Sequence, residues 1–138
     1  MPDRPEDPID LSDHRQLVGQ RFGPGPGIIV DKARVAAFCR AIGASPTSDV
    51  PLLLVVSLLP ALGSGIELPL PQPRATINYG LNGLERISDV QIGDVLQSSF
   101  TISGVRDLGS AVQINRTVEI SNNGNLAVIV ETVARLVL

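Results

Sequence analysis

The sequence has little of the residue types on which most catalytic and metal sites depend. Its 138 residues include one cysteine, Cys39, one histidine, His14, and no tryptophan. A lone cysteine excludes an internal disulfide and a cysteine cluster, and zinc would have to rest mainly on carboxylates, which it seldom does in proteins. A Ser-His-Asp or Cys-His arrangement would have to use His14. We therefore predict no metal and no cofactor.

Positive charge and phosphate-binding motifs are also scarce. Lys32 is the only lysine, the net charge is −3, and the arginines form no stripe in the sequence. Nucleic acid binding requires a concentrated basic surface, so we do not expect it. The segment GPGPG at residues 23–27 lacks the Lys-Ser/Thr of a phosphate loop, and its two prolines have no N–H to donate. It is predicted to be a turn that leads into a strand.

Targeting signals are missing as well. The N-terminus, MPDRPEDPID, has neither the basic start nor the apolar stretch of a signal peptide. The longest apolar run is shorter than the roughly 20 residues that span a bilayer. We expect a cytoplasmic protein without membrane contact. Residues 1–16 predict a flexible arm in which His14 is solvated, and residues 17–138 predict a single domain.

Apolar residues make up 43% of the chain, enough for a substantial core. Residues 31–42 predict a helix that begins at Asp31 and ends at Gly43. Its apolar residues recur at helical spacing and place Cys39 in a buried stripe rather than at a reactive site; they are Val35, Phe38, Cys39 and Ile42.

The densest apolar run, residues 52–62, is interrupted only by Ser57 and Pro60. As a strand it would carry Pro60, which is tolerated only at a sheet edge, so we predict a helix. A helix that is apolar all round must be enclosed on every side. Ser48 or Asp49 is expected to cap it, with Pro51 in the first turn, where its missing N–H costs nothing. Pro60 is expected to bend or end its last turn.

The rest of the chain predicts strands, over residues 74–82, 91–108, 110–121 and 125–138. The segment 110–121 shows apolar alternation, and NNG at 122–124 is a strong hairpin turn. Its expected inward-facing residues are Val112, Ile114, Thr117, Val118 and Ile120. The predicted fold is α+β, with an antiparallel sheet curled around one buried helix.

Three segments carry a family resemblance: SLLPAL (57–62), INYGLNGLERISDVQIGDVL (77–96) and VIVETVARLVL (128–138). In this order they resemble the MaoC-like hot-dog proteins, in particular the NodN-like branch, which is related to the (R)-specific enoyl-CoA hydratases. The segment 17–43 is similar to that branch's opening strand and helix. The resemblance implies a hot-dog fold, dimers, and acyl-CoA-type tunnels at the subunit interface. It also implies hydration of an enoyl thioester by an Asp and a His before the central helix.

The sequence departs from the family at this catalytic loop. Ala44 stands where the family has its Asp, Pro51 and Leu52 replace the His-Gly at the start of the helix, and no histidine follows His14. The Asp/His pair is therefore missing. Asp49 is the only carboxylate near the former site, and a helix cap is its simpler interpretation.

Other residues remain as candidates. Tyr79, Asp49 and Asn78 are the candidate catalytic residues, and alternation places Tyr79 and Asn78 on opposite faces of their strand. A buried tyrosine hydroxyl can donate a proton, although a packing role is the plainer interpretation. The candidate substrate-binding residues are Asn82, Arg74, Arg86 and Leu53, and the two arginines are expected at an exposed rim.

Three functions fit these observations. The first is a hot-dog enzyme that binds a small hydrophobic or acyl-thioester-like ligand and transforms it by lyase-like chemistry diverged from the Asp/His mechanism. The second is a non-catalytic subunit that completes the substrate channel of an active MaoC-like partner. The third is a conventional hydratase with a substitute pair, such as Asp49 with His14. The protein is accordingly expected to be a homodimer or a heterodimer with a MaoC-like partner.

Overall fold

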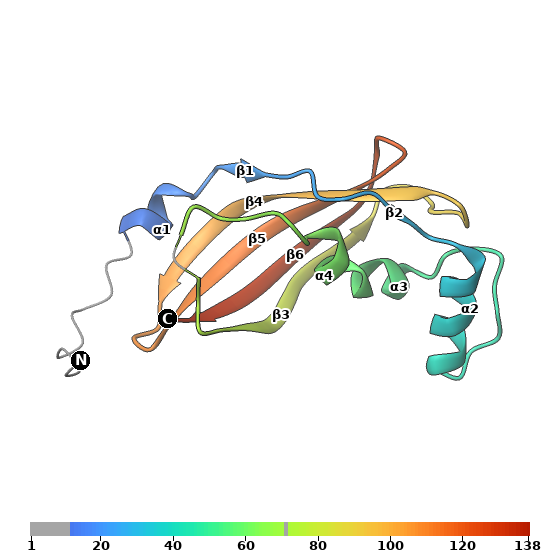
Figure 1. Ribbon diagram of the computed structural model, residues 1–138, viewed down its shortest axis with the longest axis horizontal. Coiled ribbons are helices and arrows are strands. Elements are labelled where there is room, and N and C mark those ends of the chain that lie inside the picture. Colours follow the sequence, from blue (N-terminus) through green and yellow to red (C-terminus); the bar gives the residue numbers. More distant parts are fainter. Residues whose placement is uncertain (1–11, 71) are drawn as a thin grey trace.

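One strongly curved antiparallel sheet dominates the computed structural model, which describes residues 12–70 and 72–138 (Figure 1). The strand order is β1-β4-β5-β6-β3, with β2 also paired to β4. The long strands are β3 (Ala75–Arg86), β4 (Val95–Asp107), β5 (Ala111–Asn122) and β6 (Asn125–Val137). The short strands are β1 (Arg21–Phe22) and β2 (Ile28–Ile29). The four predicted strands are confirmed, and β3 continues four residues beyond its predicted end at residue 82.

The predicted hairpin turn joins β5 to β6. Asn123 and Gly124 have φ values of 48° and 88°, as a two-residue turn of the type that matches strand twist requires. The register opposes Ile120 to Val128 and Val118 to Val130. Because side chains alternate along a strand, these residues face the same concave side of the sheet, which holds the core.

The first long helix is α2 (Lys32–Ala41), in agreement with the prediction. Asp31 caps it, because its Oδ1 accepts a hydrogen bond of 2.8 Å from the backbone N of Arg34. Val35 and Cys39 are buried, whereas Ile42 is exposed beyond the helix end. Of the predicted apolar stripe, two residues are thus buried, Phe38 is partly buried, and Ile42 is exposed.

The central helix is interrupted beside Pro60, where a bend or end was predicted, and it differs from its prediction in two other ways. It consists of two short helices, α3 (Leu52–Ser57) and α4 (Leu59–Leu62), which meet at Leu58. The break lies just before Pro60, whose ring has no N–H for the helical ladder. The N-cap of α3 is Pro51, without a side-chain hydrogen bond, so the predicted cap is wrong. Asp49 is exposed and forms a backbone bridge to Gln91 instead.

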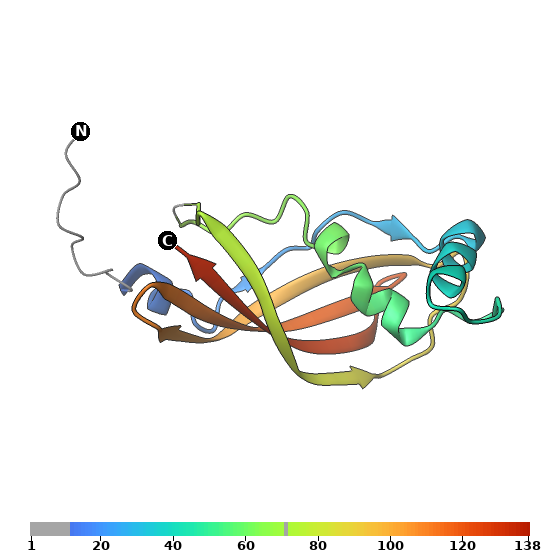
Figure 2. The same ribbon diagram turned by 90° about the horizontal axis from the view of Figure 1, so that it is seen from below.

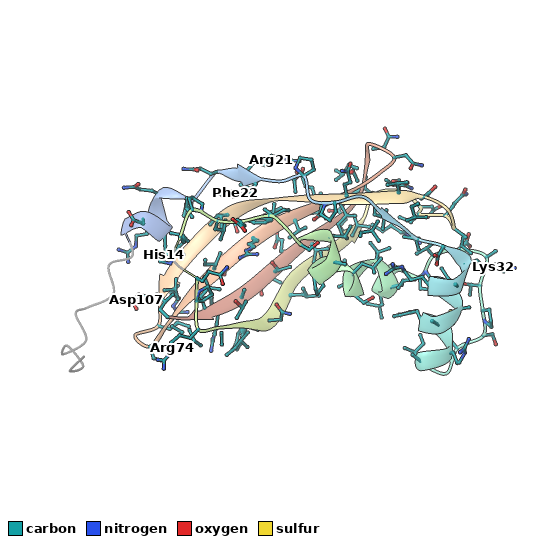
Figure 3. All side chains as sticks on the ribbon, viewed as in Figure 1. His14, Arg21, Phe22, Lys32, Arg74 and Asp107 are labelled. Atoms are coloured by element: carbon teal, nitrogen blue, oxygen red, sulfur yellow. The ribbon has the colours of Figure 1, made fainter. Side chains whose placement is uncertain are left out.

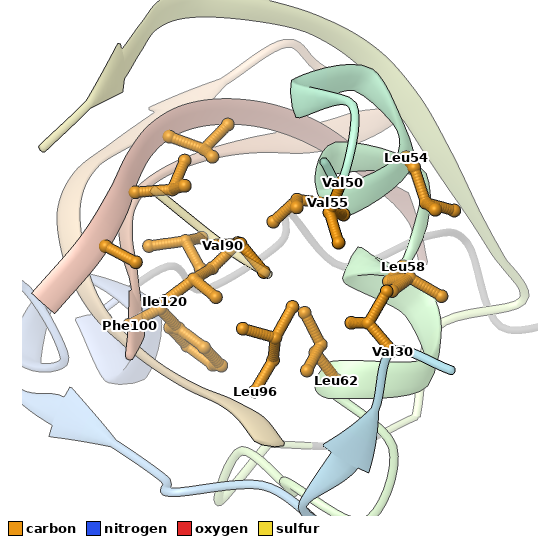
Figure 4. Packing of buried hydrophobic residues seen from close by; sticks show 14 of the residues in the cluster. Val30, Val50, Leu54, Val55, Leu58, Leu62, Val90, Leu96, Phe100 and Ile120 are labelled. Carbon is orange, nitrogen blue, oxygen red and sulfur yellow. The ribbon is translucent and has the colours of Figure 1, made fainter. Parts of the chain in front are cut away.

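The prediction that this helix is enclosed on every side is also wrong. α3 and α4 lie against the concave face of the sheet, as the view in Figure 2 shows, and one side of them remains open. Leu62 is 0% exposed, whereas Leu53 is 63% exposed. Figure 4 shows the buried side of this helical segment packed against residues of the sheet, including Leu96 and Ile120. The apolar sequence therefore predicts this helix but does not show which of its sides is buried.

The GPGPG segment links β1 to β2 along the edge of β4. Gly25 is buried, and its backbone N donates a hydrogen bond of 2.9 Å to the carbonyl of Ser98. The hydroxyl of Ser98 donates in turn to the carbonyl of Leu62, over 3.1 Å. The predicted turn thus also holds the end of α4 against β4.

The C-terminal end of the predicted arm is folded. Residues 12–16 form α1 (Ser12–Gln16), which contacts β4, and residues 1–11 lie outside the described residues. His14 is 5% exposed, so its predicted solvation is wrong, because α1 and Leu17 continue the core beyond the sheet edge. Within residues 12–70 and 72–138, none of the helices has the length and apolar character needed to cross a membrane.

The Gly-Asp turn before β4 is fixed by Asp94. Its carboxylate accepts hydrogen bonds from the backbone N of Gln91 (2.7 Å) and from the amides of Asn122 (2.5 Å) and Asn123 (3.3 Å). The backbone donor at Gln91 has the largest effect and lowers the pKa of Asp94. Burial opposes it, and the amides of Asn122 and Asn123 add to the lowering, so that the pKa lies below its ordinary value. The turn and the β5–β6 hairpin are therefore tied together by one ionised carboxylate.

We expect Asp94→Asn to destabilise the protein by about 1 kcal/mol at neutral pH, through loss of charge-assisted hydrogen bonds. Because the folded pKa is depressed, the contribution of the carboxylate is present above about pH 4 and is lost as the pH falls through the folded value. Urea titrations from pH 7 to pH 3 measure this difference. The difference in free energy of unfolding between the parent and the variant should decrease in acid. A difference that stays constant with pH would contradict the role of ionisation.

Candidate functional site

A cavity of about 520 Å³ lies on the concave side of the sheet, between the α3–α4 segment and strand β3. This volume is in the range of small-molecule sites. Most of its wall is apolar, with hydroxyl and amide groups interspersed and a single charged side chain, Arg116. The lining residues that matter below are Ser57, Asn78, Leu81, Phe100, Arg116 and Thr132.

Arg116 occupies a core-facing position of β5. It lies between Ile114 and Val118 in the alternation, and both of those side chains are buried. Its guanidinium carbon is 4.6 Å from the centre of the Phe100 ring, a cation–π contact with the neighbouring strand. Burial lowers the pKa of Arg116, although an arginine stays charged in proteins. A positive charge is thus held at the wall of an apolar cavity.

Neutral polar groups accompany this charge. Thr132 lies opposite Arg116 in the β5–β6 register, and Asn78 lies opposite Ala134, two residues further along β6. The hydroxyl of Ser57 is engaged with the carbonyl of Leu54 at 2.6 Å. Guanidinium and amide N–H groups can donate to a carbonyl or carboxylate oxygen and polarise it. The described lining contains no carboxylate or imidazole.

Asn78 and Tyr79 point to opposite faces of β3, as alternation predicts. Asn78 lines the cavity. Tyr79 is 58% exposed, and its ring lies 3.5 Å from the guanidinium carbon of Arg135. Arg135 also donates from Nε to the side chain of Gln113 over 3.3 Å. Because Gln113 and Arg135 oppose each other on the convex face, Tyr79 belongs to that face and not to the cavity.

The other candidate residues lie apart from the cavity wall. Leu53, Asn82 and Arg74 are exposed and do not line it. Arg86 is exposed at the far end of β3 and forms an ion pair of 3.5 Å with Asp89. Asp49 is exposed in the segment between α2 and α3.

The pairing of Asp49 with His14 is not formed. α1, which carries His14, lies at one end of the molecule, and α2, just before Asp49, lies at the other (Figures 1 and 3). Both ring nitrogens of His14 are buried without a hydrogen-bond partner.

The sequence contains a signal for Arg116 that the expected inward-facing set passed over. That set includes Thr117, which breaks the two-residue period between Ile114 and Val118. Strict alternation from Val112 to Ile120 places residue 116 inward, and the structure shows this arrangement. A charged residue in register with a buried strand face is the pattern that identifies the site.

Solved structures with this architecture are known, although no family model and no curated protein matches the sequence. A MaoC-like dehydratase from Rhodospirillum rubrum aligns with a TM-score of 0.68 at 17% identity, covering 87% of this chain and 92% of that one. An (R)-hydratase from A. caviae involved in PHA biosynthesis gives 0.61 at 24%, covering 86% and 96%. The truncated HadBC complex of Mycobacterium tuberculosis, a 3R-hydroxyacyl-ACP dehydratase, gives 0.62 at 14%, covering 86% and 96%. These likenesses confirm the predicted hot-dog fold.

Proposed function

We propose that this protein binds a small hydrophobic acyl-type ligand in the cavity and transforms it by lyase-like chemistry without an Asp/His pair. The observation that carries the proposal is the pairing of Arg116 and Asn78 with apolar walls in one cavity of suitable size. The likeness in fold to a dehydratase and an (R)-hydratase supports a reaction of the lyase type. The NodN-like resemblance of the sequence points the same way.

The donors fit the charge that develops in such a reaction. When water adds to an α,β-unsaturated acyl group, or leaves from the hydroxyacyl product, negative charge accumulates on the acyl oxygen. N–H groups fixed around that oxygen stabilise the charge in a low-dielectric site. Arg116 and Asn78 are assigned this role. Of the three catalytic candidates, Asn78 is thus retained in the cavity, whereas Tyr79 and Asp49 lie outside it within one chain.

A ligand panel tests the proposal. Crotonyl-CoA and longer 2-enoyl-CoA thioesters are incubated with high enzyme concentrations, and the loss of enoyl absorbance is followed. The corresponding saturated acyl compounds are titrated by calorimetry. We expect binding that strengthens with acyl chain length, since apolar walls contribute about 0.8 kcal/mol per buried methylene. Absence of binding by every acyl compound would rule out the proposal.

Asn78→Ala is expected to weaken binding of the same saturated acyl ligand roughly two- to tenfold, the equivalent of one neutral hydrogen bond of 0.5–1.5 kcal/mol. Tyr79→Phe is the matched control on the neighbouring residue. Because the Tyr79 ring lies on the convex face, loss of its hydroxyl should leave affinity and turnover unchanged. A larger loss in the Tyr79 variant than in the Asn78 variant would contradict the assignment of the cavity.

The alternative function is that of a subunit that completes the substrate channel of an active partner. The specific observation in its favour is strand β3, which forms part of the cavity wall and lies at the edge of the sheet. β3 also exposes a row of apolar side chains, Ile77, Tyr79, Leu81 and Leu84. An unpaired apolar edge strand is a template for another chain, which would extend the cavity wall and could bring the missing base. The HadBC complex, a 3R-hydroxyacyl-ACP dehydratase, shares this fold.

Sedimentation analysis separates the two functions. The purified chain is measured alone and mixed with a MaoC-like hydratase, and each sample is assayed for enoyl-CoA turnover. Activity that appears only in a mixed complex favours the alternative. A stable homodimer that turns over substrate by itself would exclude it.

A further inference from the structure

The guanidinium of Arg116 lacks a protein partner of opposite charge. Among the described residues, the two ion pairs join Arg21 to Glu119 and Arg86 to Asp89. Nε of Arg116 is fully buried and has no hydrogen-bond partner within residues 12–70 and 72–138. The contact that the structure does provide is the face of Phe100, which attracts a cation but cannot accept the in-plane hydrogen bonds of a guanidinium.

Such a position is unfavourable for the free protein. Removing a charge from water costs far more than a cation–π contact returns, and replacing buried charges by apolar side chains often stabilises proteins. Arg116 is half-buried between Ile114 and Val118, and its Nε is fully buried, so its guanidinium is desolvated in part. An arginine at this position points to a role that a second, negatively charged molecule would complete.

The surroundings of Arg116 define that molecule. Phe100, Leu81 and Ile66 provide apolar surface along the cavity, while Thr132 and Asn78 add neutral polar groups close to the guanidinium in the strand register. The fork of an arginine matches the two oxygens of a carboxylate, and such paired, charge-assisted bonds are the strong ones. A single cation in an otherwise apolar wall is complementary to a ligand that carries one negative charge and is hydrophobic elsewhere.

We infer that the cavity is a binding site for an apolar monocarboxylic acid, whose ionised carboxylate pairs with Arg116 while its hydrocarbon tail packs against Phe100, Leu81 and Ile66. This inference rests on the proposed function and adds that, among the acyl compounds the cavity admits, the free acid binds most tightly. A thioester presents only a neutral carbonyl oxygen and leaves the charge of Arg116 uncompensated.

The test compares octanoate with octanamide and with octanoyl-pantetheine, by calorimetry and by thermal shift. These compounds share the tail and differ in the head group. Octanoate should bind at least about tenfold more tightly than the amide, as expected for charge-assisted hydrogen bonds. Its affinity should fall as the pH drops through the pKa of the acid. Equal affinity for the amide or the thioester would overturn the inference alone, whereas no binding by any of the three would overturn the proposed function as well.

Arg116→Met removes the charge and keeps a long apolar side chain. We expect octanoate affinity to fall at least about tenfold, octanamide affinity to stay the same, and the Tm to be unchanged or higher. Arg106→Met is the control, since it makes the same change at an exposed arginine of β4. Arg116→Lys, which keeps the charge but not the fork, should bind octanoate with intermediate affinity. A lowered Tm with unchanged octanoate affinity would show that Arg116 is structural.

Discussion

Replacement of Leu62 by alanine is expected to lower the free energy of unfolding by about 3 kcal/mol and the Tm by roughly 10 °C. Leu62 is completely buried at the end of α4, where it packs with Leu96 in the core (Figure 4). Truncation removes apolar contacts and leaves a void that the curved sheet cannot readily close. Urea unfolding of the purified variant, with the slope of the transition compared to that of the parent, measures the loss.

Leu53→Ala is the matched control, because both residues are leucines of the same apolar run. Leu53 is 63% exposed, so its truncation should change stability by less than about 0.5 kcal/mol in the monomer. Equal losses at the two positions would contradict the orientation of α3 and α4. A loss at Leu53 that grows with protein concentration would instead indicate that another chain covers this side.

Gly25→Ala is expected to lower the free energy of unfolding by about 3 kcal/mol or to prevent folding. This loss is at the upper end of the range for overpacking. A Cβ at residue 25 would overlap the carbonyl oxygen of Leu62 and lie 3.2 Å from Cδ1 of Ile66. Backbone cannot move aside there, because the same carbonyl receives the hydroxyl of Ser98. The soluble yield and the midpoint of thermal unfolding measure the effect.

Gly104→Ala serves as the control for that change. A Cβ at residue 104 would lie at least 3.8 Å from the side chain of Asn115, which is an ordinary van der Waals distance. We expect a change in stability within about 0.5 kcal/mol. If Gly25→Ala changes stability as little as Gly104→Ala, the close packing of GPGPG against α4 seen in the structure is contradicted.

Periodicity was sufficient to predict the sheet and the first helix. Alternation in 110–121 and the NNG turn correspond to real strands and a real hairpin, because the two faces of this sheet differ sharply in burial. The uniform run at 52–62 carried no such contrast. Its composition predicted a helix that Pro60 bends or ends, but not the exposed position of Leu53. Which side of an apolar helix is covered depends on tertiary packing, which composition does not record.

The candidate site was predicted less completely. Asn78 was named from its motif and lines the cavity, whereas Arg116 was passed over although its place in the alternation was visible. The burial of His14 had no sequence signal, because it depends on α1 docking against β4. Asp49 was placed by analogy with a catalytic loop that is barely present in this chain. Residues on regular strands were thus predictable, while residues positioned by docking were not.

The pairing of β3 has a consequence for the order of events during synthesis. β3 hydrogen-bonds to β6, whereas β4 and β5, which lie between them in the sequence, pair with each other. On the ribosome, therefore, residues 75–86 have no strand to join until residues 125–137 have emerged. Until then the cavity has no β3 wall, and the apolar side chains of β3 are open to other chains. Slower translation between residues 87 and 124 should prolong this exposure, and with it the dependence of the nascent protein on chaperones.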